Sequence, residues 1–209
     1  MRLSIYTSKG GQGKTPLSVM FNVDHGFAIG CNESTDIYAK HLNPDMYLLH
    51  KMDQAFPQIP DDINIVFDMA GTLTEYDHAL VSALRQSDVV IVPISNCEVS
   101  KDLGANTIRA ISDITKRIVV VATHLERNNE QGVPWTETAD FKEVFDVVSG
   151  IDNTIKVLPL KYSRVFKKRI YKEFTSIHKL VEDRRIVKTG QLEILAQIED
   201  IYKEVGLSC

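Results

Sequence analysis

Short apolar runs alternate with longer amphipathic stretches along most of the 209-residue chain. Six of the runs are bounded by turn-forming residues and consist mostly of apolar side chains, a pattern typical of strands buried on both faces of a sheet. The predicted strands are Leu3–Thr7, Phe27–Cys31, Ile63–Asp68, Val89–Pro93, Ile118–Ala122 and Ile155–Pro159.

Apolar residues at three- and four-residue intervals predict helices between and after these strands. The predicted helices are Leu17–Val23, Thr74–Gln86, Ser100–Ile114, Phe141–Val148 and Gln191–Val205. Alternating strands and helices favour an α/β fold with a doubly wound, mostly parallel sheet flanked by helices. The polar stretch Glu126–Thr138 is expected to form a surface loop. No repeat or linker divides the chain, so residues 1–209 are predicted to be a single domain.

The composition, with 44% hydrophobic and 25% charged residues, is that of a soluble globular protein. No apolar window approaches the length of a membrane span and no signal sequence begins the chain, so we expect a cytoplasmic protein. The cysteines Cys31, Cys97 and Cys209 are far apart and odd in number. This spacing fits neither a disulfide framework nor a paired-Cys metal site, and we expect reduced thiols.

A glycine-rich loop from Lys9 to Thr15 follows the first predicted strand and precedes the first predicted helix. Its backbone N–H groups and the helix N-terminus can bind phosphate oxygens, Lys14 adds a full positive charge, and the Thr15 hydroxyl can ligate Mg²⁺. Proline is tolerated in the first turn of a helix, where Pro16 lies. The predicted nucleotide-binding residues are Lys9, Gly10, Gly11, Gln12, Gly13, Lys14, Thr15 and Pro16.

The loop departs from the common G-x-x-x-x-G-K-[ST] pattern, whose first glycine would fall on Ser8. It resembles the KGGxGK[ST] variant of the ParA/MinD superfamily of P-loop ATPases, the deviant Walker A motif. In that family the signature lysine, here Lys9, reaches across a dimer interface toward the partner's nucleotide. The resemblance therefore implies an ATP-bridged homodimer. The alternative for Lys9 is a solvent-exposed loop lysine.

The predicted strand Ile63–Asp68 ends in a carboxylate and looks like the family's Walker B strand. An acid at the carboxyl end of such a strand faces the ligand crevice, where it can hold Mg²⁺. Thr15 and Asp68 are thus the predicted metal residues. The segment from Gly71 to Thr74 is expected to be a switch-like loop that senses the terminal phosphate.

The second predicted strand departs most from the family. Relatives end it with Asp-x-Asp-Pro, whose first Asp positions the attacking water, and by placement Asn32 takes that position here. An amide can orient water but cannot accept its proton, so a weak ATPase is predicted unless Glu33 or Asp36 substitutes. The predicted catalytic residues are Lys9, Lys14, Asn32 and Asp68.

Two further segments bear on the resemblance. The stretch from Ser87 to Ile111 resembles the family's segment in which a strand ends in proline, here Pro93, and a helix near the dimer interface follows. After Ile118–Ala122, however, the Asn that relatives often use near the adenine is missing. His124 is interpreted as a loop histidine because no ligand spacing surrounds it.

The region from Lys161 to Lys188 holds ten Lys or Arg and three acidic residues, although the whole chain carries −4. Arg164, Lys168 and Lys172 are spaced four apart, which would place them on one helical face, and Lys167 and Arg169 would broaden it. Such a face suits the phosphates of nonspecific DNA, and ParA relatives bind DNA through this region. A solvated helix face is the alternative.

The last predicted helix, Gln191–Val205, is amphipathic, but its polar face is mainly acidic. A membrane-surface helix normally carries Lys and Arg there, so we predict core packing and no membrane cycle. The favoured hypothesis is a ParA-like partition or plasmid-stability ATPase that dimerises on ATP·Mg²⁺, binds nucleoid DNA and has a ParB-like adaptor, the last implied only by resemblance. A non-hydrolysing, ATP-dependent scaffold for a protein cargo is the alternative, and a small-molecule kinase or synthetase is a third.

Overall fold

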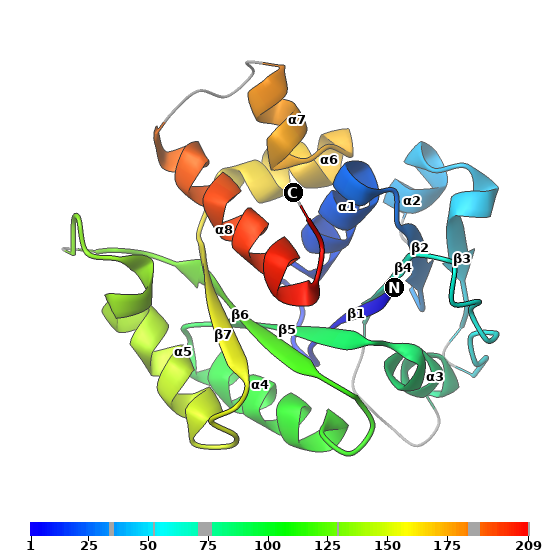
Figure 1. Ribbon diagram of the computed structural model, residues 1–209, viewed down its shortest axis with the longest axis horizontal. Helices are drawn as coiled ribbons and strands as arrows, with labels where there is room; N and C mark the ends of the chain where they lie inside the picture. Colours follow the sequence, from blue (N-terminus) through cyan, green and yellow to red (C-terminus); the bar gives the residue numbers. More distant parts are fainter. Residues whose placement is uncertain (34–35, 52, 71–76, 129, 184–188, 209) are drawn as a thin grey trace.

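A computed structural model describes residues 1–33, 36–51, 53–70, 77–128, 130–183 and 189–208 of the chain. Its seven strands form one parallel sheet in the order β3-β2-β4-β1-β5-β6-β7. Helices cover both faces of the sheet (Figure 1). The predicted doubly wound α/β class is confirmed. The strands are β1 (Arg2–Tyr6), β2 (Ala28–Cys31), β3 (Tyr47–Leu49), β4 (Ile65–Met69), β5 (Val89–Ser95), β6 (Ile118–Leu125) and β7 (Lys156–Lys161).

The helices divide between the two faces of the sheet. On one face, α1, α7 and α8 surround a core that includes Leu3, Ile5 and Phe21, and on the other α3, α4 and α5 pack over Tyr6, Phe67 and similar residues. The α-helices are α1 (Lys14–His25), α2 (Asp36–His41), α3 (His78–Gln86), α4 (Glu98–Ile111), α5 (Ala139–Ser149), α6 (Tyr171–Glu173), α7 (Ile177–Glu182) and α8 (Thr189–Val205). Two 3₁₀ turns, η1 (Pro44–Met46) and η2 (Trp135–Glu137), and a π-helix, η3 (Phe166–Ile170), complete the elements.

Strand β1 lies between β4 and β5 and pairs with both. Strands β2, β3 and β4 lie on one side of β1, and β5, β6 and β7 lie on the other, so the order of strands reverses at β1. In an open parallel sheet such a reversal leaves a crevice outside the carboxyl ends of the strands, where ligands bind. The glycine loop, which follows β1 directly, is placed at this crevice.

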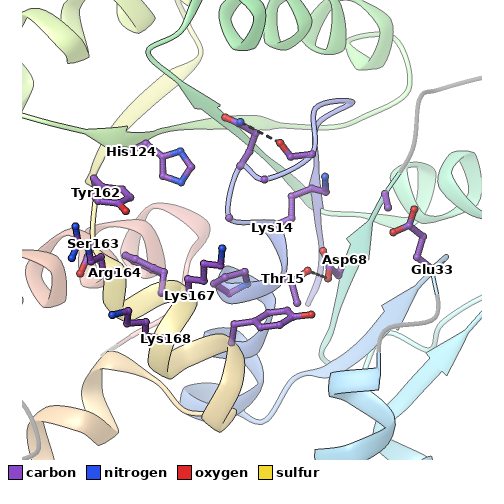
Figure 2. Close-up of a pocket in the computed structure, with 18 of the residues that line it drawn as sticks. Lys14, Thr15, Glu33, Asp68, His124, Tyr162, Ser163, Arg164, Lys167 and Lys168 are labelled. Carbon is purple, nitrogen blue, oxygen red and sulfur yellow. Dashed lines mark hydrogen bonds between the residues drawn. The ribbon is translucent and has the colours of Figure 1, made fainter.

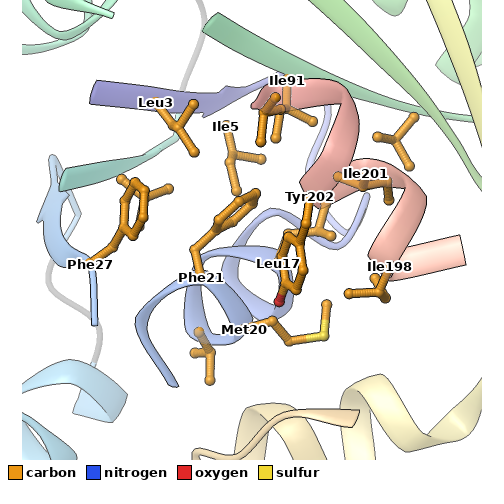
Figure 3. Close-up of a cluster of buried hydrophobic side chains, with 14 of the residues drawn as sticks. Leu3, Ile5, Leu17, Met20, Phe21, Phe27, Ile91, Ile198, Ile201 and Tyr202 are labelled. Atoms are coloured by element: carbon orange, nitrogen blue, oxygen red, sulfur yellow. The ribbon is translucent and has the colours of Figure 1, made fainter. Parts of the chain in front are cut away.

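The predicted core role of the last helix is confirmed. Figure 3 shows Ile198, Ile201 and Tyr202 of α8 directed toward α1 and the central strands. Tyr202 contacts the ring of Phe21 edge-on at 5.1 Å between centroids. Leu192, an apolar residue of the same helix, is 50% exposed because it lies in the first turn of α8, beyond the edge of this core. No helix within the described ranges is both long and apolar enough to cross a membrane.

Several predicted boundaries were wrong. Strands β5, β6 and β7 continue to Ser95, Leu125 and Lys161, because backbone pairing extends through polar residues that an apolar run does not mark. Pro93 accordingly lies inside β5, opposite Val121, and does not end the strand. Helix α3 begins at His78, and the earlier part of the predicted helix, residues 74–76, lies outside the described residues.

The first helix spans Lys14–His25, longer than the predicted Leu17–Val23. Gly13 is its N-cap and Gly26 its C-cap, and Gly26 has φ +68° and donates its N–H to the carbonyls of Asn22 and Phe21. The first and last turns of the helix contain polar residues, so the apolar period that predicted the helix does not extend to its ends. The short elements β3, α2 and α7 were not predicted, since each has too few residues to establish a period.

A buried carboxylate near the end of α1 ties three helices together. Asp24 Oδ2 accepts a hydrogen bond from the Tyr202 hydroxyl at 2.8 Å and lies 3.0 Å from His178 Nδ1. The hydrogen bond to Asp24 raises the pKa of His178. Helix α7 is thereby held against α1 and α8, and the basic segment that precedes α7 is fixed at its C-terminal end.

Candidate functional site

A cavity of about 800 Å³ opens at the carboxyl edge of the sheet, at the crevice beside β1. It is lined by the glycine loop, by the ends of β2, β4 and β6, and by the segment that follows β7 (Figure 2). This volume lies within the range of small-molecule and cofactor sites.

The glycine loop has the backbone geometry of a phosphate site. Gly11 and Gly13 have φ of +76° and +89°, which side chains other than glycine rarely adopt. Gly13 is also the N-cap of α1 and, having no side chain, makes no side-chain cap to the first-turn N–H groups. The helix N-terminus, with its partial positive charge, therefore borders the cavity.

Gln12 anchors the loop from behind. Its Oε1 accepts hydrogen bonds from the Ser95 backbone N–H at 2.9 Å and from the Ser100 hydroxyl at 2.8 Å. The side chain is only 3% exposed. The predicted nucleotide residue Gln12 thus uses its side chain to fix the loop to β5 and α4.

Lys14 is held within the loop by two carbonyls. Its Nζ donates to the Thr7 oxygen at 3.2 Å and to the Lys9 oxygen at 3.3 Å. Burial lowers the pKa of Lys14, and the nearby charges of Asp68 and Glu33 oppose that shift. The ammonium is therefore positioned before any ligand arrives, which reduces the entropy lost on binding.

The two predicted metal residues are in direct contact. The Thr15 hydroxyl donates to Asp68 Oδ2 at 2.7 Å, a bond drawn in Figure 2. Tyr38 of α2 donates to the same oxygen at 2.6 Å and is fully buried. Sequence reasoning missed Tyr38, because nothing in the short α2 segment marks its hydroxyl as a partner of β4. A hydroxyl and a carboxylate at this spacing are the oxygen ligands that Mg²⁺ prefers.

Asn32 lies directly after β2 and joins it to the end of β4. Its amide donates to the Ala70 carbonyl at 2.9 Å and accepts from the Ala70 N–H at 2.8 Å. Both ends of the amide are thus engaged with backbone, and the residue is 6% exposed. Glu33, by contrast, is exposed and lines the cavity. The side chain of Asp36, the other predicted substitute, lies outside the described residues.

Lys9 extends away from the loop toward α4 of its own chain. Its Nζ lies 2.9 Å from Sγ of Cys97, the N-cap residue of α4. Hydrogen bonding from Lys9 lowers the pKa of the Cys97 thiol, whereas burial raises that of Cys31 to about 12. Sequence reasoning gave Cys97 no partner, because it is 88 residues from Lys9.

The far end of the cavity is aromatic and cationic. His124, with φ +58°, contacts the Tyr162 ring edge-on at 5.9 Å between centroids. Both residues line the cavity, and the interpretation of His124 as a loop histidine was wrong because it lies within β6. Arg164, Lys167 and Lys168 line the same end.

The predicted single basic face, with Arg164, Lys168 and Lys172 aligned on one helix, was wrong in its geometry. Residues 166–170 form a π-helix, and the helical run ends at Phe174 in a left-handed conformation with φ +49°. Lys172 is exposed and is not among the cavity-lining residues, and Arg169 forms an ion pair with Glu173. The predicted cations therefore divide between the cavity and the outer surface.

Neither a protein-family model nor a curated protein sequence matches the chain. Solved structures do match it over nearly its whole length. The ATP complex of a McdA variant from Cyanothece has a TM-score of 0.64 at 11% identity and covers 100% of this chain and 98% of its own. MinD from Aquifex aeolicus has a TM-score of 0.62 at 12% identity, with coverages of 99% and 97%. A putative plasmid partition protein from Borrelia burgdorferi B31, bound to AMPPNP, has a TM-score of 0.55 at 12% identity, with coverages of 97% and 98%.

The chain has the ParA/MinD fold. In this fold the glycine loop and Asp68 line one cavity, and Cys31 and Glu33, the neighbours of Asn32, line it as well, whereas Asn32 itself does not. The predicted switch-like loop from Gly71 to Thr74 lies outside the described residues. Arg184, Arg185 and Lys188 of the basic region lie outside them as well.

The contact between Lys9 and Cys97 gives a measurable expectation. Since Lys9 lowers the pKa of Cys97, more of this thiol is thiolate near neutral pH, and iodoacetamide should modify Cys97 well before Cys31. Lys9→Ala should raise that pKa, move the pH–rate curve for Cys97 upward, and slow its modification several-fold at pH 7. Peptide mass mapping over a pH series measures this. An unchanged Cys97 rate profile in Lys9→Ala, with Lys142→Ala as the charge-matched control, would contradict the contact.

Proposed function

We propose that the chain is an ATP-dependent binding switch of the ParA type. It binds ATP with Mg²⁺, dimerises on the nucleotide, and in that state binds DNA nonspecifically for plasmid or chromosome partition or plasmid stability. The observation that carries the proposal is the Thr15–Asp68 contact beside Lys14 at the uncapped N-terminus of α1. Matching structures hold ATP, AMPPNP or Mg-ADP, which supports the same ligands here.

The residues around the loop fit this ligand. Lys14 and the loop amides from Gly10 to Thr15 would bind the phosphates, with Pro16 shaping the first turn of α1. Thr15 and Asp68 would hold Mg²⁺, which supplies charge neutralisation to the phosphates when bound. Lys9 would leave Cys97 to act across the dimer interface, the role that the family resemblance assigns to it.

Hydrolysis is proposed to be weak. Asn32 has no proton-accepting group, and its amide is engaged with Ala70 on both sides. Glu33 is the exposed carboxylate of the described cavity lining, and it would have to orient or deprotonate a water in place of Asn32. The catalytic set of the proposal is therefore Lys9, Lys14, Asn32 and Asp68, with Glu33 as the substitute base.

DNA contact is assigned to the basic segment after β7. The residues are Arg164, Lys167, Lys168, Arg169 and Lys172. Such cations bind backbone phosphates without base choice, so the protein would associate with the nucleoid in the cytoplasm. A ParB-like DNA-binding adaptor is the partner that the family resemblance suggests.

The test is DNA retention and solution mass measured without nucleotide, with ADP, and with a nonhydrolysable ATP analogue. We expect a dimer and DNA retention only with the ATP analogue. Arg164→Gln/Lys168→Gln/Lys172→Gln should weaken retention and reduce the salt slope by up to about 3, at roughly 0.9 per lost phosphate contact. The control, Lys40→Gln/Lys142→Gln/Lys203→Gln, removes as many charges from other surfaces. Equal retention in both triple variants would refute the DNA assignment.

The second candidate is a non-hydrolysing scaffold that positions a protein cargo on ATP binding. The engaged amide of Asn32 favours it, because no carboxylate stands at the water-positioning place. Single-turnover hydrolysis with DNA and partner present separates the two. If the wild-type protein hydrolyses ATP appreciably and Asp68→Asn abolishes that hydrolysis, the non-hydrolysing scaffold is excluded.

A further inference from the structure

The nucleotide cavity has a second cationic wall that lies opposite the glycine loop. This wall consists of three cations from the segment after β7, namely Arg164, Lys167 and Lys168. Lys14 of the glycine loop lines the same cavity. Figure 2 shows Lys167 extending into the space framed by His124, Lys14 and Thr15. Three of the five cations assigned to DNA thus border the nucleotide site of their own chain.

The charges in this cavity are unbalanced. Among the described lining residues, four cations, Lys14, Arg164, Lys167 and Lys168, face two carboxylates, Glu33 and Asp68. No carboxylate of the described residues forms an ion pair with Arg164, Lys167 or Lys168. Their neighbours Lys161 and Arg169 do have carboxylate partners, Glu193 and Glu173. Like charges gathered around a hollow repel one another unless an anion enters, so this wall favours a polyanionic ligand.

Two of these cations, Lys167 and Lys168, belong to the π-helix η3. The Tyr171 N–H bonds to the Phe166 carbonyl, five residues earlier, and Lys167 and Lys168 both line the cavity while Ile170 is buried in the core. π-helical turns are rare and frequently occur at functional sites.

The segment is also tied to the metal residues. Phe174, which ends it, stacks on His41 at 5.2 Å and meets the Tyr38 ring edge-on at 6.4 Å between centroids. Tyr38 is the residue whose hydroxyl bonds to Asp68. The basic wall, α2 and Asp68 therefore form one packed unit around the cavity.

We propose that Arg164, Lys167 and Lys168 are a second phosphate-binding wall, which contacts the nucleoside di- or triphosphate bound to the same chain. This inference rests on the proposed ATP binding. Lys167 extends into the cavity (Figure 2) and carries most of the contact. The wall recognises charge, so its contribution grows with the number of phosphates on the nucleoside and shrinks as salt rises.

The test is the affinity of the full-length protein for ATP, ADP, AMP and adenosine, measured by calorimetry at two salt concentrations. Lys167→Gln should weaken ATP and ADP roughly five- to tenfold, as expected for one partly exposed charge-assisted contact, and should change adenosine less than twofold. Lys203→Gln, an exposed lysine on α8, is the control. The triple variant Arg164→Gln/Lys167→Gln/Lys168→Gln should lose more ATP affinity than Lys167→Gln and should flatten its salt dependence.

Three results would contradict the proposal of a second phosphate-binding wall. They are ATP affinity within twofold of wild type in the triple variant, an equal loss for adenosine and ATP, and a loss of DNA retention with unchanged ATP affinity. The proposed function fails differently, because it requires the wild-type protein itself to bind ATP. Thermal melting of each variant confirms that the fold is retained.

Discussion

Replacing Lys14 with Ala is expected to reduce ATP affinity about a hundredfold or more. The Lys14 ammonium donates hydrogen bonds to the carbonyls of Thr7 and Lys9 at the N-terminus of α1, where its full charge would face the phosphates. A charge-assisted hydrogen bond of this kind contributes about 1.5–3 kcal/mol, and a preorganised phosphate contact in a partly enclosed site lies at the upper end. Titration of a fluorescent ATP analogue measures the loss.

The effect should be specific to the site. Lys40→Ala, which removes an exposed lysine from α2, should leave ATP affinity unchanged. Lys14→Ala should also melt close to wild type, because the loss of its hydrogen bonds to two carbonyls is offset by the removal of a charge whose burial lowers its pKa. Retained ATP affinity in a folded Lys14→Ala variant would place the nucleotide elsewhere.

Asp68→Asn is expected to abolish the Mg²⁺ dependence of ATP binding while stabilising the protein without ligand. Burial raises the pKa of Asp68, so the folded state disfavours the ionised carboxylate. A carboxyl group whose pKa is raised by folding favours the folded state at low pH, and this stabilisation is lost as the pH rises through the folded-state pKa. Near pH 7 the buried charge of Asp68 therefore destabilises the fold. The amide oxygen of Asn can still accept from Thr15 and Tyr38. The melting temperature should rise by about 2–4 °C, equivalent to about 1 kcal/mol.

Binding and melting are measured on the same preparations with and without Mg²⁺. Wild-type ATP affinity should increase roughly ten- to a hundredfold with Mg²⁺, and that of Asp68→Asn should not change, because the amide is a weaker metal ligand than a carboxylate. Asp45→Asn, an exposed control, should behave as wild type. An undiminished Mg²⁺ effect in Asp68→Asn would show that other groups hold the metal.

The predictions about strands and helices succeeded where hydrophobic periodicity was long. The six apolar runs all became strands, and Gln191–Val205 became a core helix, because burial on one or both faces leaves a repeating pattern in the sequence. The pattern failed at polar ends, as at Ser95 and Lys161, and in elements too short to show a period, such as β3.

The motif residues followed a similar division. Lys14, Thr15 and Asp68 could be placed together in advance, because the loop and the strand end are both fixed to the carboxyl edge of one sheet. Tyr38 and Cys97 could not, since each meets its partner only through packing between elements distant in the sequence.

The sequence by itself determined the α/β class, the phosphate loop and the Asp68 strand end, since these depend on local periodicity and on residue types that only particular backbones accept. The tertiary structure alone decided where the charges point. Of the five cations expected to lie on one helix face, Arg164, Lys167 and Lys168 line the cavity, and Arg169 and Lys172 do not. Asn32, placed by its position as a water-orienting group, is engaged by the Ala70 backbone. Side-chain direction depends on local winding and on neighbours from other elements, and neither is contained in spacing along the chain.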